Sequence, residues 1–290
     1  MPTWGGALIS SAILAVVVLL GWGLLLSLRT PRSDRTWAQD HDRLPSIVLT
    51  EEEVVLQGIR DFRYGAGGAE PQARYRDGRF ALDGVRRVWF ALAPFANRYR
   101  GLAHSFVSFE FASGDFLAIS VEARREAHEG YSLFGGLLNG FEVAYVMGSE
   151  RDLLGVRALR GDTLYLYPSV ATPDQARLLL VDMLERAHAT QEAPEFYHTL
   201  FNNCNTNLRD HVNRATTARL PWGWGVLLPG FSDALALRQG LLDTDLPLEE
   251  ARARFQVEGR VLRALAGEDD DYSRRIRDWD VGDNGVRRVP

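Results

Sequence analysis

The stretch that decides the fold runs from residue 196 to residue 210 and reads FYHTLFNNCNTNLRD. Cys204 is the single cysteine of the chain, so it has no disulfide partner within the chain and no second thiol for a cysteine-based metal site. Asn and Thr, which surround it, are residues that cap helix N-termini, and Leu208 and Val212 follow at helical spacing. We therefore expect the sulfur at the start of a helix.

This position has a chemical consequence for the thiol. The free N–H groups and the dipole of a helix N-terminus favour an anion, so they should lower the pKa of Cys204. A thiol with a lowered pKa is a nucleophile at neutral pH. The alternative is a buried structural cysteine, because free cysteine is among the most buried residue types.

The composition is that of a globular protein with a sizeable core. Hydrophobic residues make up 46% and charged residues 24% of the 290 positions. The net charge of −5 and the isoelectric point near 5.7 argue against a nucleic-acid partner, since no basic stripe with interleaved aromatic residues is present. Gly65 to Gly68 lack the lysine of a phosphate-binding loop, so we expect a flexible turn there.

Residues 5–28 form an almost unbroken apolar run without a charged side chain. About 20 such residues cross the ~30 Å hydrocarbon core of a bilayer as a helix. The run is longer than the apolar part of a signal peptide, and no basic residue precedes it. We expect residues 1–28 to be a transmembrane anchor.

The charges after this run do not decide the orientation of the anchor. Arg29, Arg32 and Arg35 would leave the main domain in the cytoplasm by the positive-inside rule, although long domains can be translocated regardless of it. A lone reduced cysteine fits either compartment.

The remaining chain predicts a linker at residues 29–49, one domain at residues 50–266 and a charged tail at residues 267–290. Alternation of apolar residues predicts strands first and helices afterwards, which indicates an α+β domain with helices packed on an antiparallel sheet. The expected strands are residues 54–62, 85–95, 104–111, 116–122, 141–147 and 164–167, with loops at 65–78 and 130–140. The expected helices start at Pro173 and Cys204 and cover residues 232–242 and 248–266.

A cysteine nucleophile needs a base within hydrogen-bonding distance. His104 opens the first strand of a predicted β-hairpin, a position that suits a base facing a helix N-terminus, although a strand histidine can equally be structural. His198 is the main rival because it is close to Cys204 in sequence.

The base in turn needs a third group that fixes its tautomer. A three-residue turn at 113–115 pairs Phe106 with Glu122 and Ser108 with Ser120, which places His104 on the face of both Ser120 and Glu122. A turn of two or four residues would reverse that face. We expect Glu122 to be the third member, the alternative being a solvated carboxylate beside Arg124.

Metal chemistry is the competing hypothesis. His104, Glu122 and His128 could supply ligands, but the chain has no HExxH motif and no His/Cys pair at ligand spacing. We expect neither a metal nor a cofactor.

Five motifs occur in an order that resembles one known family. They are AHSFVSFEF (103–111), ISVEARRE (119–126), FEVAYV (141–146), YLYP (165–168) and FYHTLFNNCNTN (196–207). The family is named for the N-terminal periplasmic domain of Lnb, a bacterial lipoprotein N-acyltransferase, and the resemblance covers roughly residues 50–260. Two positions depart from its pattern, namely Asn205-Thr206, where Thr-Thr is frequent, and His198, where Asn is frequent.

The resemblance implies a circularly permuted papain-like (NlpC/P60-like) domain in the periplasm. It assigns the catalytic roles to Cys204, His104 and Glu122. Asn203 and Asn202, together with Ser120 and Tyr197, are expected to bind substrate or the oxyanion.

The implied function is that of a membrane-anchored thiol acyltransferase. It would move an acyl chain from a membrane lipid through a thioester on Cys204 to an amine such as a lipoprotein N-terminus. The alternatives are an NlpC/P60-type cysteine hydrolase or amidase and an envelope protein that only binds. Trp222, Trp224 and Leu227 could lie at a bilayer interface, but we expect them to cover the core.

Overall fold

The computed structural model describes residues 4–65, 71–96, 98–267 and 271–279. Eight strands within these ranges form one sheet in the spatial order β1-β2-β7-β6-β5-β4-β8, and β3 pairs with β2 outside this path. Neighbouring strands are antiparallel except β2 and β7, which meet in parallel at Arg60 and Gly148. The strands are β1 (Ser46–Leu49), β2 (Glu53–Arg60), β3 (Tyr75–Ala81), β4 (Val85–Pro94), β5 (Ala103–Phe111), β6 (Phe116–Arg124), β7 (Glu142–Gly148) and β8 (Tyr165–Pro168). The expected α+β class is consistent with this sheet.

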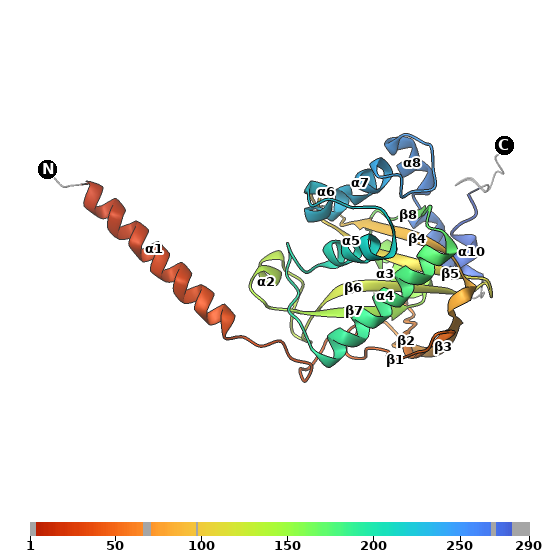
Figure 1. The fold of residues 1–290 in the computed structure, drawn as a ribbon, viewed down its shortest axis with the longest axis horizontal. Coiled ribbons are helices and arrows are strands. Elements are labelled where there is room, and N and C mark those ends of the chain that lie inside the picture. Colours follow the sequence, from red (N-terminus) through yellow and green to blue (C-terminus); the bar gives the residue numbers. More distant parts are fainter. Residues whose placement is uncertain (1–3, 66–70, 97, 268–270, 280–290) are drawn as a thin grey trace.

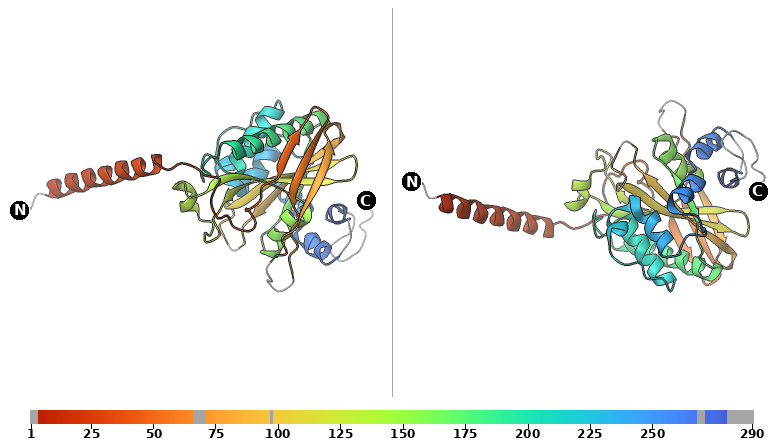
Figure 2. Two further views of the ribbon diagram at one scale, coloured as in Figure 1. Left: turned by 90° about the horizontal axis from the view of Figure 1, so that it is seen from below. Right: turned by 90° about the horizontal axis from the view of Figure 1, so that it is seen from above.

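Helices cover both faces of the sheet. On one face α4 and α5 pack over a core of Val107, Phe109 and their neighbours, and on the other α3, α9 and α10 pack over Phe106 and Ala118 (Figures 1 and 2). The helices are α1 (Trp4–Ser27), α2 (Leu133–Leu137), α3 (Glu150–Leu159), α4 (Pro173–Glu192), α5 (Cys204–Ala215), α6 (Trp224–Leu227), α7 (Ser232–Arg238), α8 (Leu248–Phe255), α9 (Glu258–Leu265) and α10 (Tyr272–Arg275), with short 3-10 turns η2 (Leu82–Gly84) and η3 (Pro229–Phe231).

The expectation of a transmembrane anchor at residues 1–28 has to be corrected. Trp4–Ser27 form one continuous helix, α1, which extends away from the sheet (Figure 1). A helix crosses a bilayer only when it is both long enough and apolar enough over about 20 residues. Within the described ranges, no helix combines the two.

The expected linker at residues 29–49 packs on the domain along most of its length. The Ala38 N–H donates to the carbonyl of Arg125 at 2.9 Å, the side chain of His41 is buried, and Ser46–Leu49 form an edge strand. These residues therefore contribute to the sheet and to its core.

Part of the expected tail at residues 267–290 also packs on the domain. Tyr272 and Ile276 are buried in the core on the α3 face, where α10 contacts α3 and α9. Residues 268–270 and 280–290 lie outside the described residues.

The hairpin of β5 and β6 determines which side chains share a face. Ser108 pairs with Ala118 and Glu110 with Phe116, so the predicted register was wrong by two residues. The turn still has three residues between Phe111 and Asp115, and Gly114 adopts the left-handed φ of +87° that this turn requires. A shift of two residues keeps every side chain on its face. The predicted common face of His104, Ser120 and Glu122 is therefore confirmed.

The two strands of this hairpin separate before they reach the site. Their pairing runs only as far as Val107 and Ile119, whereas β5 stays paired with β4 to Ala103 and β6 stays paired with β7 to Arg124. We call this opening the β5–β6 fork. The helix α5 packs against both strands, and so its N-terminus lies beside the fork.

Local sequence explains why α4 was predicted and α3 was not. Thr172 caps α4 in a capping box with Gln175, and Pro173 occupies the first turn. The apolar residues at helical spacing along α4 are buried, namely Ala176, Leu179, Leu180, Met183, Leu184 and Ala187. The ten-residue helix α3, capped by Ser149, carries Gly155 in its centre, which weakens its helical signal.

Candidate active site

Cys204 is the first residue of α5. Asn203 caps the helix, because its Oδ1 accepts hydrogen bonds from the N–H groups of Asn205 and Thr206 at 2.9 and 3.0 Å. Thr206 completes the capping box by accepting from the Asn203 N–H at 2.8 Å. The expectation that the sulfur lies at a helix N-terminus is therefore confirmed.

The thiol of Cys204 is buried beside His104. Burial raises the pKa of Cys204, but the charge and hydrogen bond of His104, together with hydrogen bonds from Ser105, outweigh it and lower the pKa below the ordinary 9.0. Ser105 follows His104 on β5, so one strand supplies both contacts with the sulfur.

The opposite side of the imidazole is held by Ser120. His104 Nε2 lies 2.6 Å from Ser120 Oγ, and Ser120 Oγ donates to Glu122 Oε1 at 2.9 Å. The hydroxyl has a single proton, which it gives to the carboxylate, so it accepts the proton on Nε2. This assignment leaves Nδ1 as the nitrogen that serves the sulfur.

Glu122 completes the line of side chains that starts at the sulfur. Its Oε1 lies 3.4 Å from His104 Nε2 and 3.5 Å from Arg157 Nη2, and its Oε2 lies 3.9 Å from His41 Nε2. Burial raises the pKa of Glu122, but His104, His41 and Arg157 together hold it well below the ordinary 4.5. The carboxylate is therefore ionised at neutral pH.

The charge on Glu122 acts on the base. Burial and the nearby Arg157 lower the pKa of His104, whereas Glu122 and Cys204 raise it, and the net effect is a pKa above 6.5. A raised imidazole pKa and a lowered thiol pKa together favour the imidazolium–thiolate pair, which is the reactive form of a cysteine nucleophile.

Asn202 and Asn203 point their side-chain amides away from the sulfur. Asn203 Nδ2 donates to the carbonyl of Thr199 at 2.6 Å, and Asn202 Nδ2 donates to the carbonyl of Phe196 at 3.0 Å. Both amides hold the loop before α5. The Cys204 N–H remains the donor best placed for an oxyanion, since the cap binds only the next two N–H groups and no acceptor for it is seen among the described residues.

Tyr197 lies in the same cavity as Cys204. Burial and the neighbouring Cys204 raise its pKa well above 10.0, so the phenol is protonated, and its ring lies edge-on to that of Tyr131 at a centroid distance of 6.5 Å. Tyr131 comes from the expected glycine-rich loop, and no pattern in the sequence singled it out.

The site opens into a cavity of about 760 Å³. His104, Glu122 and Cys204 line it together with aromatic and basic side chains from several other segments of the chain. They include His41, Tyr131, Phe134, Arg157 and Tyr197. The volume lies within the ~300–1,000 Å³ that small-molecule sites occupy.

His41 and Arg157 are site residues that sequence reasoning missed. His41 belongs to the segment taken as a linker, and Arg157 belongs to α3, which was not predicted. A single buried histidine in a polar segment leaves no periodic pattern in the sequence. Only the tertiary structure therefore reveals that His41 and Arg157 lie beside Glu122.

The rival histidines are not at the site. His198 Nδ1 accepts from the Leu200 N–H at 3.2 Å and its ring stacks on Phe201, while His128 is exposed. Over the described ranges, no group of three or more His, Cys, Asp or Glu side chains is placed to hold a metal ion.

His211 belongs to a second buried network that fixes α5 in place. Its Nδ1 contacts Asp182 of α4, and its Nε2 lies 2.7 Å from the hydroxyl of Tyr145 on β7. Burial lowers the pKa of His211 despite Asp182. This network ties the helix that carries the sulfur to a neighbouring helix and to the sheet.

The tryptophans after α5 do not cover the core, contrary to expectation. Trp222 and Trp224 are 51% and 75% exposed, whereas Val226 is buried between them and α7. The guanidinium of Arg209 lies 4.8 Å above the Trp222 ring.

Comparison with known proteins identifies the family of this chain. The family model described as the Lnb N-terminal periplasmic domain matches residues 71–230, more than half of the chain and all three residues of the Cys204–His104–Glu122 line. The chain belongs to the Lnb N-terminal periplasmic domain family. No curated protein and no solved structure matches it.

Membership in the Lnb family settles the compartment that the arginines after the apolar run left open. The domain is periplasmic, and the protein belongs to the cell envelope. Arg29, Arg32 and Arg35 had left this question undecided. The papain-like relationship implied by the resemblance stays a prediction.

Proposed function

We propose that this protein is a cysteine acyltransferase of the bacterial envelope. It would take an acyl chain from a membrane lipid ester and pass it to an amine such as a lipoprotein N-terminus. The observation that supports this proposal is the continuous line from Cys204 through His104 and Ser120 to Glu122. It provides a nucleophile, a base and a group that orients the base.

The first half-reaction loads the enzyme. His104 takes the proton of Cys204, and the thiolate attacks the ester carbonyl carbon to form a C–S bond and an oxyanion. The Cys204 N–H would stabilise that oxyanion, and one such donor is typically worth about 3 kcal/mol. Collapse breaks the C–O bond, and the alcohol leaves with the proton held by His104.

The second half-reaction transfers the acyl group from Cys204 to the amine. The amine attacks the thioester carbonyl and gives its proton to His104, the C–S bond breaks, and an amide forms while the thiolate returns. Glu122 stabilises the imidazolium during both halves. Water in place of the amine would give a fatty acid, which is the outcome expected of a hydrolase.

The test is to trap the loaded enzyme. The purified protein is incubated with phosphatidylglycerol vesicles without an amine and analysed by intact-mass spectrometry. We expect an acyl adduct that maps to Cys204 and is released by hydroxylamine, as a thioester is. The Cys204→Ala variant should carry no adduct.

A second step separates transferase from hydrolase. A diacylglyceryl lipopeptide with a free N-terminal amine is added to the loaded protein, with an N-acetylated lipopeptide as the matched control. Transfer to the free amine supports the proposal. Release of free fatty acid at the same rate with both peptides would favour a hydrolase. Failure of the folded protein to form any adduct would leave the binding-only alternative.

A further inference from the structure

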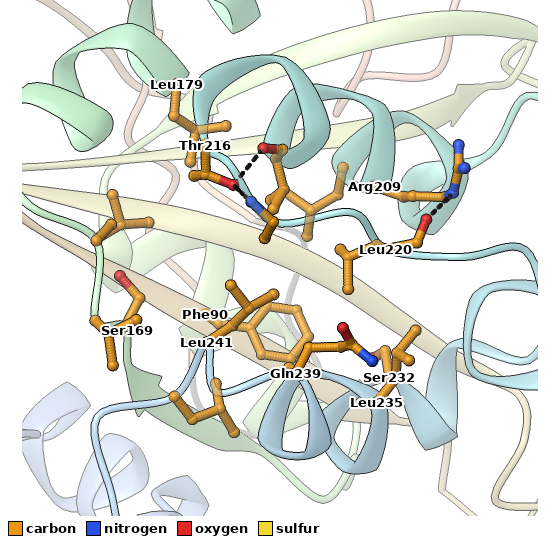
Figure 3. A pocket seen from close by; sticks show the side chains of 18 of the residues that line it. Phe90, Ser169, Leu179, Arg209, Thr216, Leu220, Ser232, Leu235, Gln239 and Leu241 are labelled. Atoms are coloured by element: carbon orange, nitrogen blue, oxygen red, sulfur yellow. Dashed lines mark hydrogen bonds between the residues drawn. The ribbon is translucent and has the colours of Figure 1, made fainter.

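A second cavity lies behind the helix that carries Cys204. It has a volume of about 380 Å³ and is bounded by β4, β5, α4, α5 and α7 (Figure 3). It shares no lining residue with the cavity that contains Cys204 and His104. It is therefore a separate site.

The walls of this cavity are aliphatic. Phe90 is the one aromatic ring among the described residues that line it, and the rest of the apolar wall consists of alanines and branched aliphatic side chains. The branched side chains are Val88, Val107, Val170, Leu179, Leu208, Val212, Leu220, Val226, Leu235, Leu241 and Leu242. Such a wall suits a flexible hydrocarbon chain better than a flat ring system, because a ligand that buries apolar surface against it is stabilised.

The polar groups at this cavity exclude a charged ligand. Arg209 is the one ionisable residue among those lining it. Its guanidinium donates to the carbonyl of Leu220 at 2.8 Å and pairs with Asp210, as Figure 3 shows for the first of these contacts. No charge is left over to neutralise a phosphate or a carboxylate.

The cavity follows α5 along one face of the helix. Asn205, Leu208, Val212 and Thr216 line it at helical spacing, which gives a length of about 16 Å at 1.5 Å per residue. The amide of Asn205 closes the inner end, because it donates to the carbonyls of Gly225 and Val226 at 2.9 Å. An extended long-chain acyl group has a comparable length.

The outer end is open and carries an unsatisfied hydroxyl. Val170, Thr217 and Gln239 at this end are exposed. Next to them, Ser169 Oγ is buried and has no hydrogen-bond partner among the described residues. A buried hydroxyl without a partner is costly, so this atom is suited to bind a polar group of a ligand.

We propose that this cavity binds one long acyl chain of an uncharged lipid, with the methyl end against Asn205 and the ester or hydroxyl head at Ser169. The inference rests on the proposed function only because that function suggests a lipid as the ligand. The acyl chain bound in this cavity is not the one whose ester carbonyl Cys204 attacks. The lipid lies along α5 on a face of the helix next to that of the sulfur.

The test measures binding in the full chain with Cys204→Ala, which cannot form a thioester. Radiolabelled 1-palmitoylglycerol is the probe, used below its aggregation concentration in equilibrium dialysis. We expect saturable binding, and hexadecyl phosphate, which has a similar chain but a charged head, should compete at least about tenfold less well. Ala236→Phe fills the cavity from α7 and should weaken binding about tenfold or more.

Three further variants make the result easier to interpret. Thr217→Trp at the exposed mouth should also weaken binding and avoids the risk of misfolding, while Ala234→Phe on the same helix does not line the cavity and should bind within about twofold. Ser169→Ala should weaken binding about fivefold, as expected for one hydrogen bond. Circular dichroism verifies that each variant is folded.

The result decides between this site and the catalytic one. Palmitoylglycerol that does not bind to the folded protein, or binds to Ala236→Phe and Thr217→Trp as tightly as to the parent, overturns the cavity proposal. Binding that persists while the unmodified protein forms no acyl adduct overturns the proposed function and leaves the cavity. If the unmodified protein forms an acyl adduct but the Cys204→Ala protein does not bind palmitoylglycerol, the cavity proposal is overturned and the proposed function remains.

Discussion

Ser120 Oγ lies 2.6 Å from His104 Nε2, closer to the imidazole than the carboxylate of Glu122 at 3.4 Å. The serine is thus a hydrogen-bonded bridge between the base and its acidic partner. It is a positioning residue, because it acts on the reaction through His104.

Replacing Ser120 by Ala should reduce the turnover number. The imidazole loses the acceptor of its Nε2 proton, and the loss of such an orienting group typically costs about tenfold to 100-fold. The KM for the acyl donor should change little. Ser108→Ala is the matched control, because this serine is buried on the adjacent strand and its hydroxyl has no partner among the described residues. Equal turnover in both variants would contradict the bridging role.

Replacing Glu122 by Gln should move the alkaline limb of the pH–rate profile. Glu122 is one of the groups that raise the pKa of His104, so removal of its charge lowers that pKa. The imidazolium then loses its proton at a lower pH, and kcat/KM should decline at a lower pH than in the parent. An unshifted alkaline limb would show that the carboxylate does not act on the base.

The same carboxylate should make stability depend on pH. The pKa of Glu122 is lower in the folded protein than its ordinary value, so its contribution is present above the ordinary carboxyl range and is lost as pH falls through the folded pKa. Thermal unfolding of the parent and of Glu122→Gln should therefore differ less at acidic than at neutral pH. A constant difference between them would count against this interaction.

The reactivity of the single cysteine should report the pKa of the nucleophile directly. His104 is the main group that lowers the pKa of Cys204, so iodoacetamide should alkylate the parent protein at a pH well below the ordinary thiol value of 9.0. His104→Gln should shift the half-maximal rate to higher pH. His198→Gln is the control, because that ring bonds Leu200 on its own loop. The same shift in both variants would rule out a specific pair.

Replacing Asn203 by Ala should destabilise the protein through the helix cap. Loss of the two hydrogen bonds that Oδ1 accepts from the Asn205 and Thr206 N–H groups is expected to lower the free energy of unfolding by about 1–2 kcal/mol, measured by urea titration. Asn203→Asp keeps the acceptor and should retain most of the stability. Its negative charge beside Cys204 should nevertheless raise the thiol pKa, so alkylation slows at neutral pH. A destabilised Asp variant with unchanged alkylation would contradict both points.

Local signals were enough to locate the central part of this fold. The alternating strands around His104 and Ser120 and the capped helix at Pro173 follow from short-range patterns, and each lies within about two residues of its predicted start. The prediction that His104 and Glu122 share a face was correct although the predicted register was not. Side chains alternate between the two faces of a strand, so a register shift of two residues leaves each on the same face.

Contacts between distant segments could not be predicted in this way. His41 reaches Glu122 from a segment that appears polar and irregular, and Arg157 reaches it from a helix that a central glycine concealed. Asn203 was expected at the oxyanion, but its amide is used by the loop carbonyl of Thr199. A polar side chain such as Asn203 can have two possible partners. Tertiary packing decides between them, and a single sequence does not show that packing.

The β5–β6 fork lets segments from both faces of the sheet contribute to one cavity. The carboxylate of Glu122 faces α3 and Arg157, whereas the sulfur of Cys204 belongs to the α5 side. The imidazole of His104 interacts with both of them. A single cation shared by two anions from different faces of the sheet therefore neutralises part of the charge of each.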